Sequence, residues 1–258
     1  MLLAIDVGNS NIVFGLMKGE TLVGSFRQVT DYDRTAEEIG RELREGLKTL
    51  GVEPEEITGT IIASVVPPVM DALCAAAGQV TGRPPLVVDR DVDPGLPYEA
   101  EERLGADRAV CCVAASQKYG APLIILDFGT ATTVDAVAPD GSYLGGCILA
   151  GIRTSVNALF RNTAMLPQID LAYPPTVLGR DAVTHIQVGA VVGAVGSAEY
   201  LTRKTKEEMG CDGPIRVIAT GGLAPLVARH ADFIDAVDPD LILDGLQMIY
   251  QRYQETGK

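Results

Sequence analysis

Tryptophan is absent from the 258-residue chain, and aromatic residues make up only 5% of it. Glycine, by contrast, is frequent at 28 residues, and the hydrophobic fraction of 47% is enough for a sizeable core. Many glycines and few aromatics favour an α/β fold over a β-sandwich. The length fits one large domain or two small ones.

Cysteine and histidine are too few and too unpatterned to indicate a zinc site or a thiol nucleophile. The five cysteines show no CxxC spacing, and the two histidines form no HExxH pattern. An odd number of unpatterned cysteines indicates reduced thiols, which predicts a cytoplasmic protein.

Long apolar runs and excess positive charge are also missing. No segment reaches the roughly 20 apolar residues that a membrane span needs, and the opening Met1–Asp6 has no basic stretch, so we predict neither a transmembrane helix nor a signal peptide. The formal net charge of −13 repels nucleic-acid backbones and anionic membranes. We therefore expect no nucleic-acid partner and no membrane contact.

A self-similarity without gaps, at a spacing of 121 positions, is the most informative feature of the chain. Residues 2–7 read LLAIDV before GNSN, and residues 123–128 read LIILDF before GTAT. The same spacing carries TLVG at 21–24 onto SYLG at 142–145. Each copy has the pattern of a buried strand, an Asp-x-Gly turn and two further strands. This duplication resembles actin, hexokinase and Hsp70, and it predicts an α/β fold of duplicated actin-like (ribonuclease H-like) domains with mixed β-sheets flanked by helices.

The boundary between the two domains is predicted near Tyr119–Pro122, where a helical pattern stops at glycine and proline. Residues 1–119 would form the first actin-like domain, and residues 120–258 the second, which would include dimerisation helices. Helices are predicted at 35–50, 106–118, 152–164 and 180–209, and buried strands at 61–66 and 216–219. In the helix at 180–209, glycines 189, 193 and 196 form a stripe that indicates either tight packing within the fold or a dimer contact.

The first Asp-x-Gly turn, Asp6–Asn11, is a candidate phosphate site. Glycine lets backbone N–H groups turn toward phosphate oxygens, and Asn9 and Ser10 add neutral donors. Asp6 can bind a hydrated Mg²⁺, which prefers oxygen ligands and bridges phosphates. An ordinary Asx-Gly corner looks similar, so one such turn alone is weak evidence.

The second turn, Asp127–Thr133, repeats this chemistry with threonine hydroxyls that suit the β- and γ-phosphates. Asp127 either ligates a cation or caps backbone amides. Two such turns at equivalent positions are hard to explain as hairpin chemistry alone. Gly221 and Gly222 follow a predicted strand and offer a flat surface for adenosine, although an ordinary strand-to-helix turn has the same sequence pattern.

The segment GADR at 105–108 begins a predicted helix, where backbone N–H groups and the helix dipole favour anions. Asp107 is a candidate general base for a substrate hydroxyl. Arg108 can pair with a substrate carboxylate or stabilise the transferring phosphoryl group. Asp is also common at helix starts, so the chemistry alone leaves a surface ion pair open.

Together these motifs resemble those of the type III pantothenate kinases. The resemblance rests on segments that run in order along almost the whole chain, namely DVGNSN at 6–11, SVVPP at 64–68, GADR at 105–108, DFGTATT at 127–133, Gly145-Gly146, ATGGLAPL at 219–226 and VDPDLILDGLQMIY at 237–250. It implies ATP-dependent phosphorylation of pantothenate to 4'-phosphopantothenate, the first step of coenzyme A biosynthesis. It also implies a homodimer with the pantothenate site close to the subunit contact.

The resemblance assigns roles to individual residues. With the two glycines considered above, the residues implied to bind ATP are Asp6, Val7, Gly8, Asn9, Ser10, Asn11, Ile12, Val13, Thr130, Gly221 and Gly222. Those implied to contact pantothenate are Tyr98, Gly105, Ala106, Asp107 and Arg108. Asp107 would be catalytic, as the proton acceptor. Asp6 would lie near Mg²⁺, and Asp127 would help bind a monovalent cation, potassium or ammonium.

Three departures from the family pattern affect the substrate side. The family's YDNP is replaced by Tyr98 followed by Glu99–Glu102, and its APG reads Leu149–Gly151. Its GRNT or GKNT reads Gly179–Ala182, so the threonine hydroxyl that helps bind pantothenate is missing. One lost hydrogen bond typically costs ~0.5–1.5 kcal/mol. Weaker binding, a local substitute such as Thr184, and a changed substrate are all consistent with this.

Three other functions remain as alternatives. The family has relatives of the same fold that act as accessory factors for transcription. The presence of Asp6, Asp107, Arg108 and Asp127 argues against that role here. A kinase for another small hydroxy acid is left open by Ala182, and an actin-like assembly protein has only the shared fold in its favour.

Overall fold

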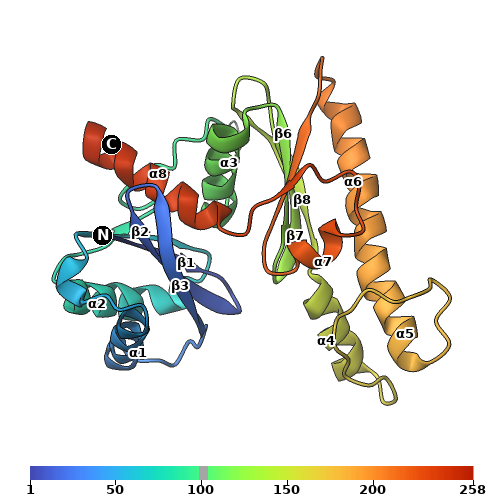
Figure 1. Cartoon of the computed structure of the whole chain (residues 1–258), viewed down its shortest axis with the longest axis horizontal. Helices are drawn as coiled ribbons and strands as arrows, with labels where there is room; N and C mark the ends of the chain where they lie inside the picture. Colours follow the sequence, from blue (N-terminus) through green and yellow to red (C-terminus); the bar gives the residue numbers. More distant parts are fainter. Residues whose placement is uncertain (99–103, 258) are drawn as a thin grey trace. The chain divides into compact units, whose positions relative to one another are not determined.

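The structure, a computed structural model, describes residues 1–98 and 104–257 and divides into two compact units (Figure 1). The first unit contains the described residues of 1–96, 100–114 and 241–258, and the second contains those of 97–99 and 115–240. Each unit is built on one five-stranded sheet. In the described part of the chain, no helix is both long enough and apolar enough to cross a membrane.

The sheet of the first unit has the strand order β3-β2-β1-β4-β5. Its strands are β1 (Leu2–Val7), β2 (Asn11–Lys18), β3 (Thr21–Val29), β4 (Gly59–Ser64) and β5 (Leu86–Val87). β1 pairs antiparallel with β2 and parallel with β4, so the sheet is mixed, as predicted. The parallel pairing puts the carboxyl ends of β1 and β4 at one edge, with Val7 opposite Ser64.

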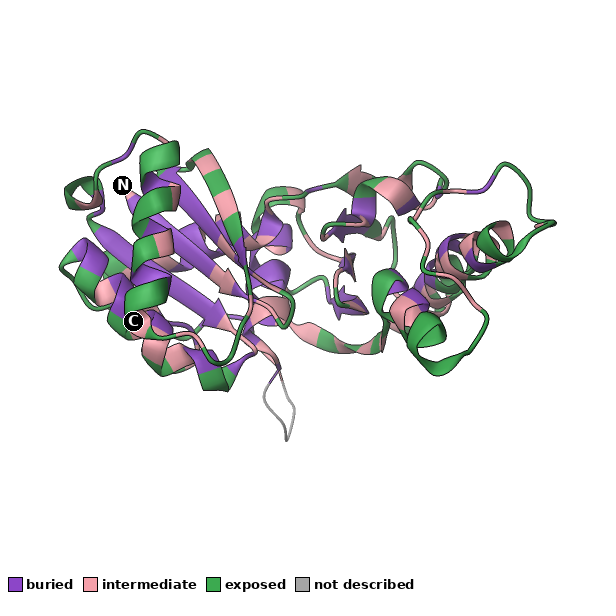
Figure 2. Ribbon diagram, turned by 90° about the horizontal axis from the view of Figure 1, so that it is seen from below, coloured by how far each residue is buried: buried purple, intermediate pink, exposed green. Residues whose placement is uncertain are grey.

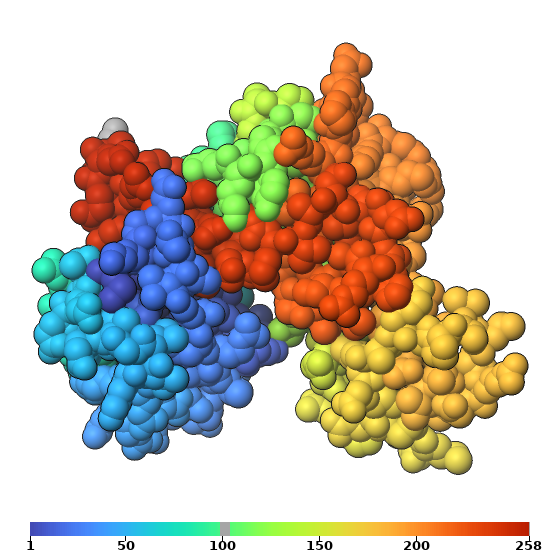
Figure 3. All heavy atoms as spheres, viewed as in Figure 1, coloured from blue at the N-terminus to red at the C-terminus, as the bar shows by residue number. Residues whose placement is uncertain are grey.

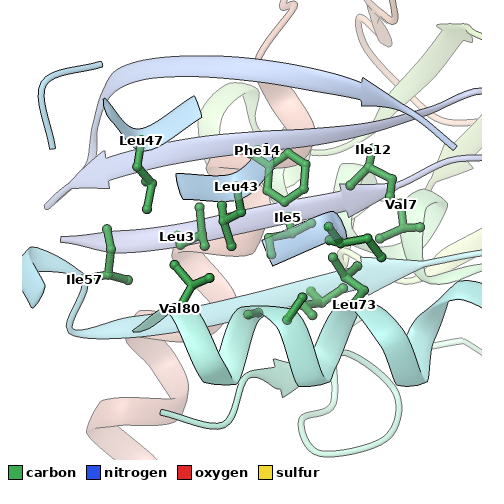
Figure 4. Packing of buried hydrophobic residues seen from close by; sticks show 14 of the residues in the cluster. Leu3, Ile5, Val7, Ile12, Phe14, Leu43, Leu47, Ile57, Leu73 and Val80 are labelled. Carbon is green, nitrogen blue, oxygen red and sulfur yellow. The ribbon is translucent and has the colours of Figure 1, made fainter. Parts of the chain in front are cut away.

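One face of this sheet carries the main core of the first unit (Figure 4). Leu3 and Ile5 alternate along β1 toward this face, as the two-residue period of a strand requires, and pack in one cluster with Leu43. The helical segments of this part of the chain are α1 (Ala36–Thr49), η1 (Pro54–Glu56), η2 (Pro67–Val69) and α2 (Met70–Thr81). Thr35 caps α1 in a reciprocal capping box with Glu38, so the helix begins one residue after the capping threonine.

The opposite face of the first sheet is covered by the C-terminal helix, α8 (Leu241–Thr256). A Cβ on Gly15 of β2 would collide with Leu243, and one on Gly59 of β4 would collide with Tyr250. The sequence prediction places residues 241–258 in the second domain, whereas the structure places them in the first unit, because the buried stripe of α8 packs on the first sheet. The division between the units also falls inside α3 (Ala106–Tyr119), after Ala114, rather than after Tyr119.

The second unit repeats the same topology, with the strand order β10-β9-β6-β7-β8. Its strands are β6 (Leu123–Phe128), β7 (Ala131–Val137), β8 (Tyr143–Ala150), β9 (Arg216–Thr220) and β10 (Ala236–Val237). Its helices are α4 (Ile152–Asn162), α5 (Ala182–Gln187), the π-helix η3 (Val188–Val192), α6 (Gly193–Met209) and α7 (Ala224–Ala228). Ile124, Leu126 and Phe128 face the core of this unit, which includes Val191 and Val195.

Strand pairing shows that the two copies differ by one residue at the first corner. Val7 pairs with Ile12 across the corner of the first copy, whereas Phe128 pairs with Thr132 in the second. The second corner is therefore one residue shorter, and Thr132 corresponds to Ile12, 120 positions earlier. The prediction of a repeat without gaps is wrong at this point.

The connection between the next two strands restores the original spacing. Gly24 of β3 lies opposite Leu16, Gly145 of β8 lies opposite Ala136, and each copy has a register shift at this place. From there the third strands again correspond at 121 positions.

Gly189, Gly193 and Gly196 lie along the helical run from α5 to α6. All three are exposed, and a Cβ on any of them would meet no atom within 4 Å. Figure 2 shows how much of this part of the second unit is exposed. The interpretation of the stripe as tight packing within the fold is therefore not supported.

Candidate active site

The first turn, residues 8–11, joins β1 to β2. The N–H of Gly8 donates to the carbonyl of Asn11 at 3.0 Å, and Asn9 and Ser10 are exposed at the tip. Ile12, directly after the turn, is 3% exposed and belongs to the core, so any contact it makes with a ligand is limited to its backbone.

Asp6 is half-buried near the end of β1. Its neighbours Ile5 and Val7 belong to the core cluster, so Asp6 points to the other face of the sheet. In the second unit, Asp127 is placed in the same way, between the core residues Leu126 and Phe128. The duplication therefore preserves one carboxylate per unit, next to the turn and away from the main core.

Thr30 contacts the first turn through two hydrogen bonds. Its backbone N–H donates to the carbonyl of Ser10 at 3.1 Å, and its hydroxyl donates to the carbonyl of Gly8 at 2.6 Å. Both turn carbonyls are thus directed toward Thr30. Carbonyl oxygens repel anions, so this arrangement suits a turn that presents its N–H groups to phosphate.

The GADR segment lies at the same edge of the first unit as the first turn. The N–H of Val65, just after β4, donates to the carbonyl of Val7 at 3.2 Å, and a Cβ on Gly105 would lie 3.6 Å from Val65 Cγ1. Asp107 is half-buried in the first turn of α3, where the helix dipole stabilises a carboxylate. Its Oδ1 accepts the backbone N–H of Arg108 at 2.7 Å.

The second turn, residues 129–131, joins β6 to β7. The N–H of Gly129 donates to the carbonyl of Ala131 at 3.0 Å, and Thr130 is exposed at the tip. The Thr130 carbonyl accepts the N–H of Gly151 at 3.1 Å and the hydroxyl of Thr154 at 2.7 Å. Gly151 directly precedes α4, so these hydrogen bonds join the start of the helix to the second turn.

Gly221 lies next to Asp127 in the second unit. It has φ +88°, and a Cβ there would lie closer than 3.0 Å to Asp127 Oδ1 and to the backbone of Phe128. Glycine is therefore required on both conformational and steric grounds. Gly222 is exposed, with no atom within 4 Å of a Cβ position.

Tyr98 belongs to the second unit, whereas Gly105–Arg108 belong to the first. It forms an isolated β-bridge with Tyr143, whose N–H donates to the carbonyl of Pro97 at 2.8 Å. The predicted departure at Glu99–Glu102 lies outside the described residues.

The described residues contain no cluster of three His, Cys, Asp or Glu side chains that could hold a metal ion. Mg²⁺ at a nucleotide usually keeps several waters and binds through one or two carboxylates plus phosphates. A single carboxylate beside the turn, as Asp6 provides, fits that mode. Asp127 likewise offers carboxylate oxygens beside the backbone of Gly221.

Ala182 is the exposed first residue of α5, and Thr184 lies in the same turn. The Thr184 hydroxyl accepts the backbone N–H groups of Arg180 at 3.0 Å and Asp181 at 3.2 Å. The N–H of Thr184 donates to the carboxylate of Asp181, which lowers the pKa of that carboxyl. Since the Thr184 hydroxyl is used to start the helix, the hypothesis that it substitutes for the missing threonine is weakened.

Two surface cavities in the described part of the chain are lined by none of the predicted site residues. One of about 280 Å³ is lined in the second unit by Arg153, Asn157 and Asp170 among others. The other, of about 560 Å³, is lined in the first unit mainly by α2 and the loop after it.

Thr30 and Thr154 were not predicted from the sequence. Gly151 was noted only in the segment Leu149–Gly151, which departs from the family's APG. A signal was present, because the spacing of 121 positions carries Thr30 onto Gly151. Asp135, described below, gave no such signal, whereas Thr133 and Tyr143 were noted only as parts of the second turn and of the repeat.

A family model described as "Type III pantothenate kinase" matches residues 2–204. The type III pantothenate kinase of Moorella thermoacetica is 42% identical over 254 residues, which cover 98% of this chain and 99% of that protein. Among solved structures, a Campylobacter jejuni protein described as a Baf family transcriptional activator has a TM-score of 0.60 at 19% identity, covering 98% of this chain and 99% of that one.

A Sinorhizobium meliloti protein described as a 2-dehydro-3-deoxygalactonokinase has a TM-score of 0.58 at 13% identity, covering 98% and 96% of the two chains. At such identities these structures bear on the fold alone, and they confirm the predicted duplicated actin-like fold. The family match and the identity over nearly the whole length go further, and they show that this chain belongs to the type III pantothenate kinase family.

Proposed function

We propose that this chain transfers the γ-phosphoryl group of ATP to the primary hydroxyl of pantothenate, giving 4'-phosphopantothenate, the first intermediate of coenzyme A biosynthesis. The observation that supports this most directly is the 42% identity to a type III pantothenate kinase across 98% of the chain. The duplicated turns support it physically, because phosphoryl transfer depends on positioning and on stabilisation of charge.

The phosphates of ATP are assigned to the N–H groups of the first and second turns, with the exposed Asn9, Ser10 and Thr130 as additional donors. Gly221 and Gly222 are assigned to adenosine. Asp6 would hold the Mg²⁺ that neutralises phosphate charge when ATP is bound, and Asp127 would hold a potassium or ammonium ion. These assignments are supported by the position of each carboxylate beside its turn.

Asp107 is assigned as the proton acceptor for the substrate hydroxyl, and Arg108 as a partner for substrate carboxylate or phosphoryl oxygens. The dipole of α3 favours the ionised form of Asp107 and the binding of an anion at the same helix end. Tyr98, Gly105 and Ala106 would complete the pantothenate contacts.

A homodimer is part of the proposal, as is the cytoplasmic location that the reduced cysteines suggest. Several exposed apolar side chains lie on α4, the loop after it and α5, namely Leu159, Phe160, Met165, Val177, Leu178 and Val183. Figure 3 shows these segments, in yellow, grouped on the surface of the second unit. A patch of this kind is typical of an interaction site. The open glycine stripe lies in η3 and α6, which follow α5 directly in the chain. Sedimentation with and without ATP would separate a dimer from a polymer.

A non-catalytic accessory factor is the second candidate, favoured only by the likeness in fold to the Campylobacter jejuni protein. A kinase of another hydroxy acid is the third, favoured by Ala182. A coupled ATPase assay with pantothenate and a panel of hydroxy acids, in potassium and then in sodium, separates the three. If no acid of the panel caused ATP to be consumed, the kinase proposal would be contradicted.

The Asp107→Asn variant tests the catalytic assignment. The amide oxygen of Asn can still accept the Arg108 N–H, so the local structure should be preserved while the base is lost. We expect kcat to fall about 10²- to 10⁴-fold, with ATP binding nearly unchanged.

The matched control for Asp107→Asn is Asp71→Asn, which alters an acidic residue in the first turn of α2 in the same unit. It should leave kcat near that of the unsubstituted enzyme. Near-normal kcat in Asp107→Asn would exclude Asp107 as the base.

A further inference from the structure

A buried carboxylate that the proposed mechanism does not use lies in the middle of β7. Asp135 is 2% exposed, and a buried charge is costly unless hydrogen bonds compensate it. Its two oxygens accept different hydroxyls. Thr133 Oγ1 donates to Oδ2 at 3.1 Å, and the phenol of Tyr143 donates to Oδ1 at 3.0 Å.

Thr133 and Asp135 lie on the same face of the second sheet as Asp127. Thr133 is the direct cross-strand partner of Asp127, and Asp135 is two residues further along β7. Cross-strand partners share a face, as do residues two apart in a strand. Thr133, Asp135 and Tyr143 therefore form a polar row that begins beside the proposed cation ligand.

The far end of the polar row is Tyr98. Tyr143 and Tyr98 form a β-bridge, and their rings are perpendicular, with an interplanar angle of 89° and centroids 6.4 Å apart. This edge-to-face arrangement is one of the favoured geometries of aromatic pairs. Asp135 accepts the phenol of Tyr143, and Tyr143 contacts Tyr98 through ring and backbone, so the row extends from Asp127 to Tyr98.

The first copy shows that the fold itself does not need this row. By strand pairing, Asp135 corresponds to Gly15, Thr133 to Val13, and Tyr143 to Leu22. All three equivalents are apolar, yet the first sheet has the same order and the same register shift. A buried carboxylate with two hydroxyl partners is therefore a special feature of the second unit.

We propose that Asp135 and Tyr143 are positioning residues that orient Tyr98 toward the acceptor substrate, a small hydroxy acid with its own carboxylate. This inference rests on the proposed function, in which Tyr98 contacts that substrate. The polar row acts on the acceptor and leaves the contacts to ATP unchanged.

Tyr143→Phe is the mildest test, because it removes the hydroxyl bound to Asp135 and keeps the ring against Tyr98. We expect the KM for pantothenate to rise about 2- to 10-fold, the effect of one net hydrogen bond, with kcat and the KM for ATP within about twofold of the unsubstituted enzyme. Tyr143→Leu, which copies Leu22 of the first unit, removes the ring as well and should raise the same KM further.

Tyr119→Phe is the matched control, since it removes a phenol that donates to another buried carboxylate of the same unit, Asp238, at 2.8 Å. It should leave kcat, the KM for pantothenate and the KM for ATP unchanged. A melting temperature is measured for each variant, because a row that only stabilised the sheet would lower the melting temperature without moving the KM for pantothenate.

The outcomes separate this inference from the proposed function. Turnover by the unsubstituted enzyme, with the KM for pantothenate unchanged in both Tyr143→Phe and Tyr143→Leu, would refute the inference alone. An equal rise in the KM for ATP would also refute it. Absence of turnover by the unsubstituted enzyme with every hydroxy acid of the panel would refute the proposed function and this inference with it.

Discussion

The first and second turns are fixed by the same kind of contact, supplied by different residues. In the first unit, Thr30 donates both its backbone N–H and its hydroxyl to carbonyls of the turn. In the second unit these donors are divided, since Gly151 supplies the N–H and Thr154 the hydroxyl. Thr30 and Gly151 are equivalent positions of the repeat.

The second turn leaves no space for a side chain at position 151. A Cβ on Gly151 would lie closer than 3.0 Å to the carbonyl oxygens of Gly129 and Thr130, a distance that Cβ atoms essentially never show. With no room for a side chain at that position, the hydroxyl comes from one helical turn further on, at Thr154. The comparison teaches that the duplication preserves hydrogen bonds to the turn carbonyls rather than the identity of the residue that makes them.

Among changes at the two turns, the largest effect is expected from giving Gly151 a side chain, as the equivalent Thr30 has in the first unit. In Gly151→Ala the new Cβ meets backbone atoms, which cannot rotate away, so the second turn must shift. We expect a loss of about 1–3 kcal/mol in the free energy of unfolding. Since a displacement of ~1 Å can cost ~10²-fold, kcat/KM should fall by about that factor. Urea denaturation and steady-state kinetics measure the two effects.

Gly78→Ala is the control for that substitution. Gly78 lies in α2, and the nearest atom to a Cβ there is 3.7 Å away, an ordinary contact. This variant should retain full activity and equal or greater stability, since alanine is the better helix former. If Gly151→Ala were as active as Gly78→Ala, the contrast between the two turns would be wrong.

A smaller effect is expected from removing only the hydroxyls. Thr30→Val should raise the KM for ATP by about 2- to 10-fold, because the carbonyl of Gly8 loses a hydrogen bond in a half-buried place. Thr154→Val should have the smaller effect of the two, since the Thr130 carbonyl keeps the N–H of Gly151 and Thr154 is exposed. Steady-state kinetics with ATP as the varied substrate gives the order.

Serine at either position retains the hydroxyl and should restore the KM. Thr49→Val and Thr163→Val are controls, because each of these hydroxyls donates to a helix carbonyl away from the turns. If Thr154→Val raised the KM for ATP as much as Thr30→Val or more, the N–H of Gly151 would not compensate for the lost hydroxyl. The expected order of the two variants would then be wrong.

Much of the fold could be predicted because short sequence patterns indicate the strands and turns of each copy of the repeat. The strand-turn-strand signal predicted both β1 to β3 and β6 to β8, and helical periodicity located α1 and α3 to within one or two residues. The packing of α8 could not be predicted in this way. Its apolar stripe fits either sheet, and only tertiary contacts such as Leu243 against Gly15 decide between them.

The candidate site was predicted where chemistry and position coincide in a short motif, as at Asp6, Asp107 and Asp127. It was missed where hydrogen bonds join residues far apart in sequence. Thr30 lies 22 residues from Gly8 and Thr154 lies 24 residues from Thr130, and neither distance leaves a local pattern. Asp135 was missed because a single polar residue inside an apolar strand gives no indication of its partners.

The smallest expected effect concerns the capping boxes of α1 in the first unit and α5 in the second. Glu38 and Thr184 occupy the same position in the boxes of α1 and α5, and each accepts the N–H of its own N-cap residue. Glu38→Met and Thr184→Val should each lower the melting temperature by about 1–3 °C. The KM for pantothenate should stay unchanged in both, and an increase confined to Thr184→Val would restore the hypothesis that Thr184 replaces the missing family threonine.

The stability effects of Glu38→Met and Thr184→Val should respond differently to acid. Hydrogen bonds from Thr35 lower the pKa of Glu38 below its ordinary 4.5, so its contribution is complete above that pH and is lost as the pH falls through the lowered value. The difference between Glu38→Met and the unsubstituted chain should therefore disappear in acid. The Thr184 hydroxyl does not titrate there and keeps accepting the N–H of Asp181, so the Thr184→Val difference should persist in urea-denaturation midpoints measured from pH 7 downward. Equal loss of both differences would mean that the α5 box depends on the charge of Asp181 rather than on the hydroxyl.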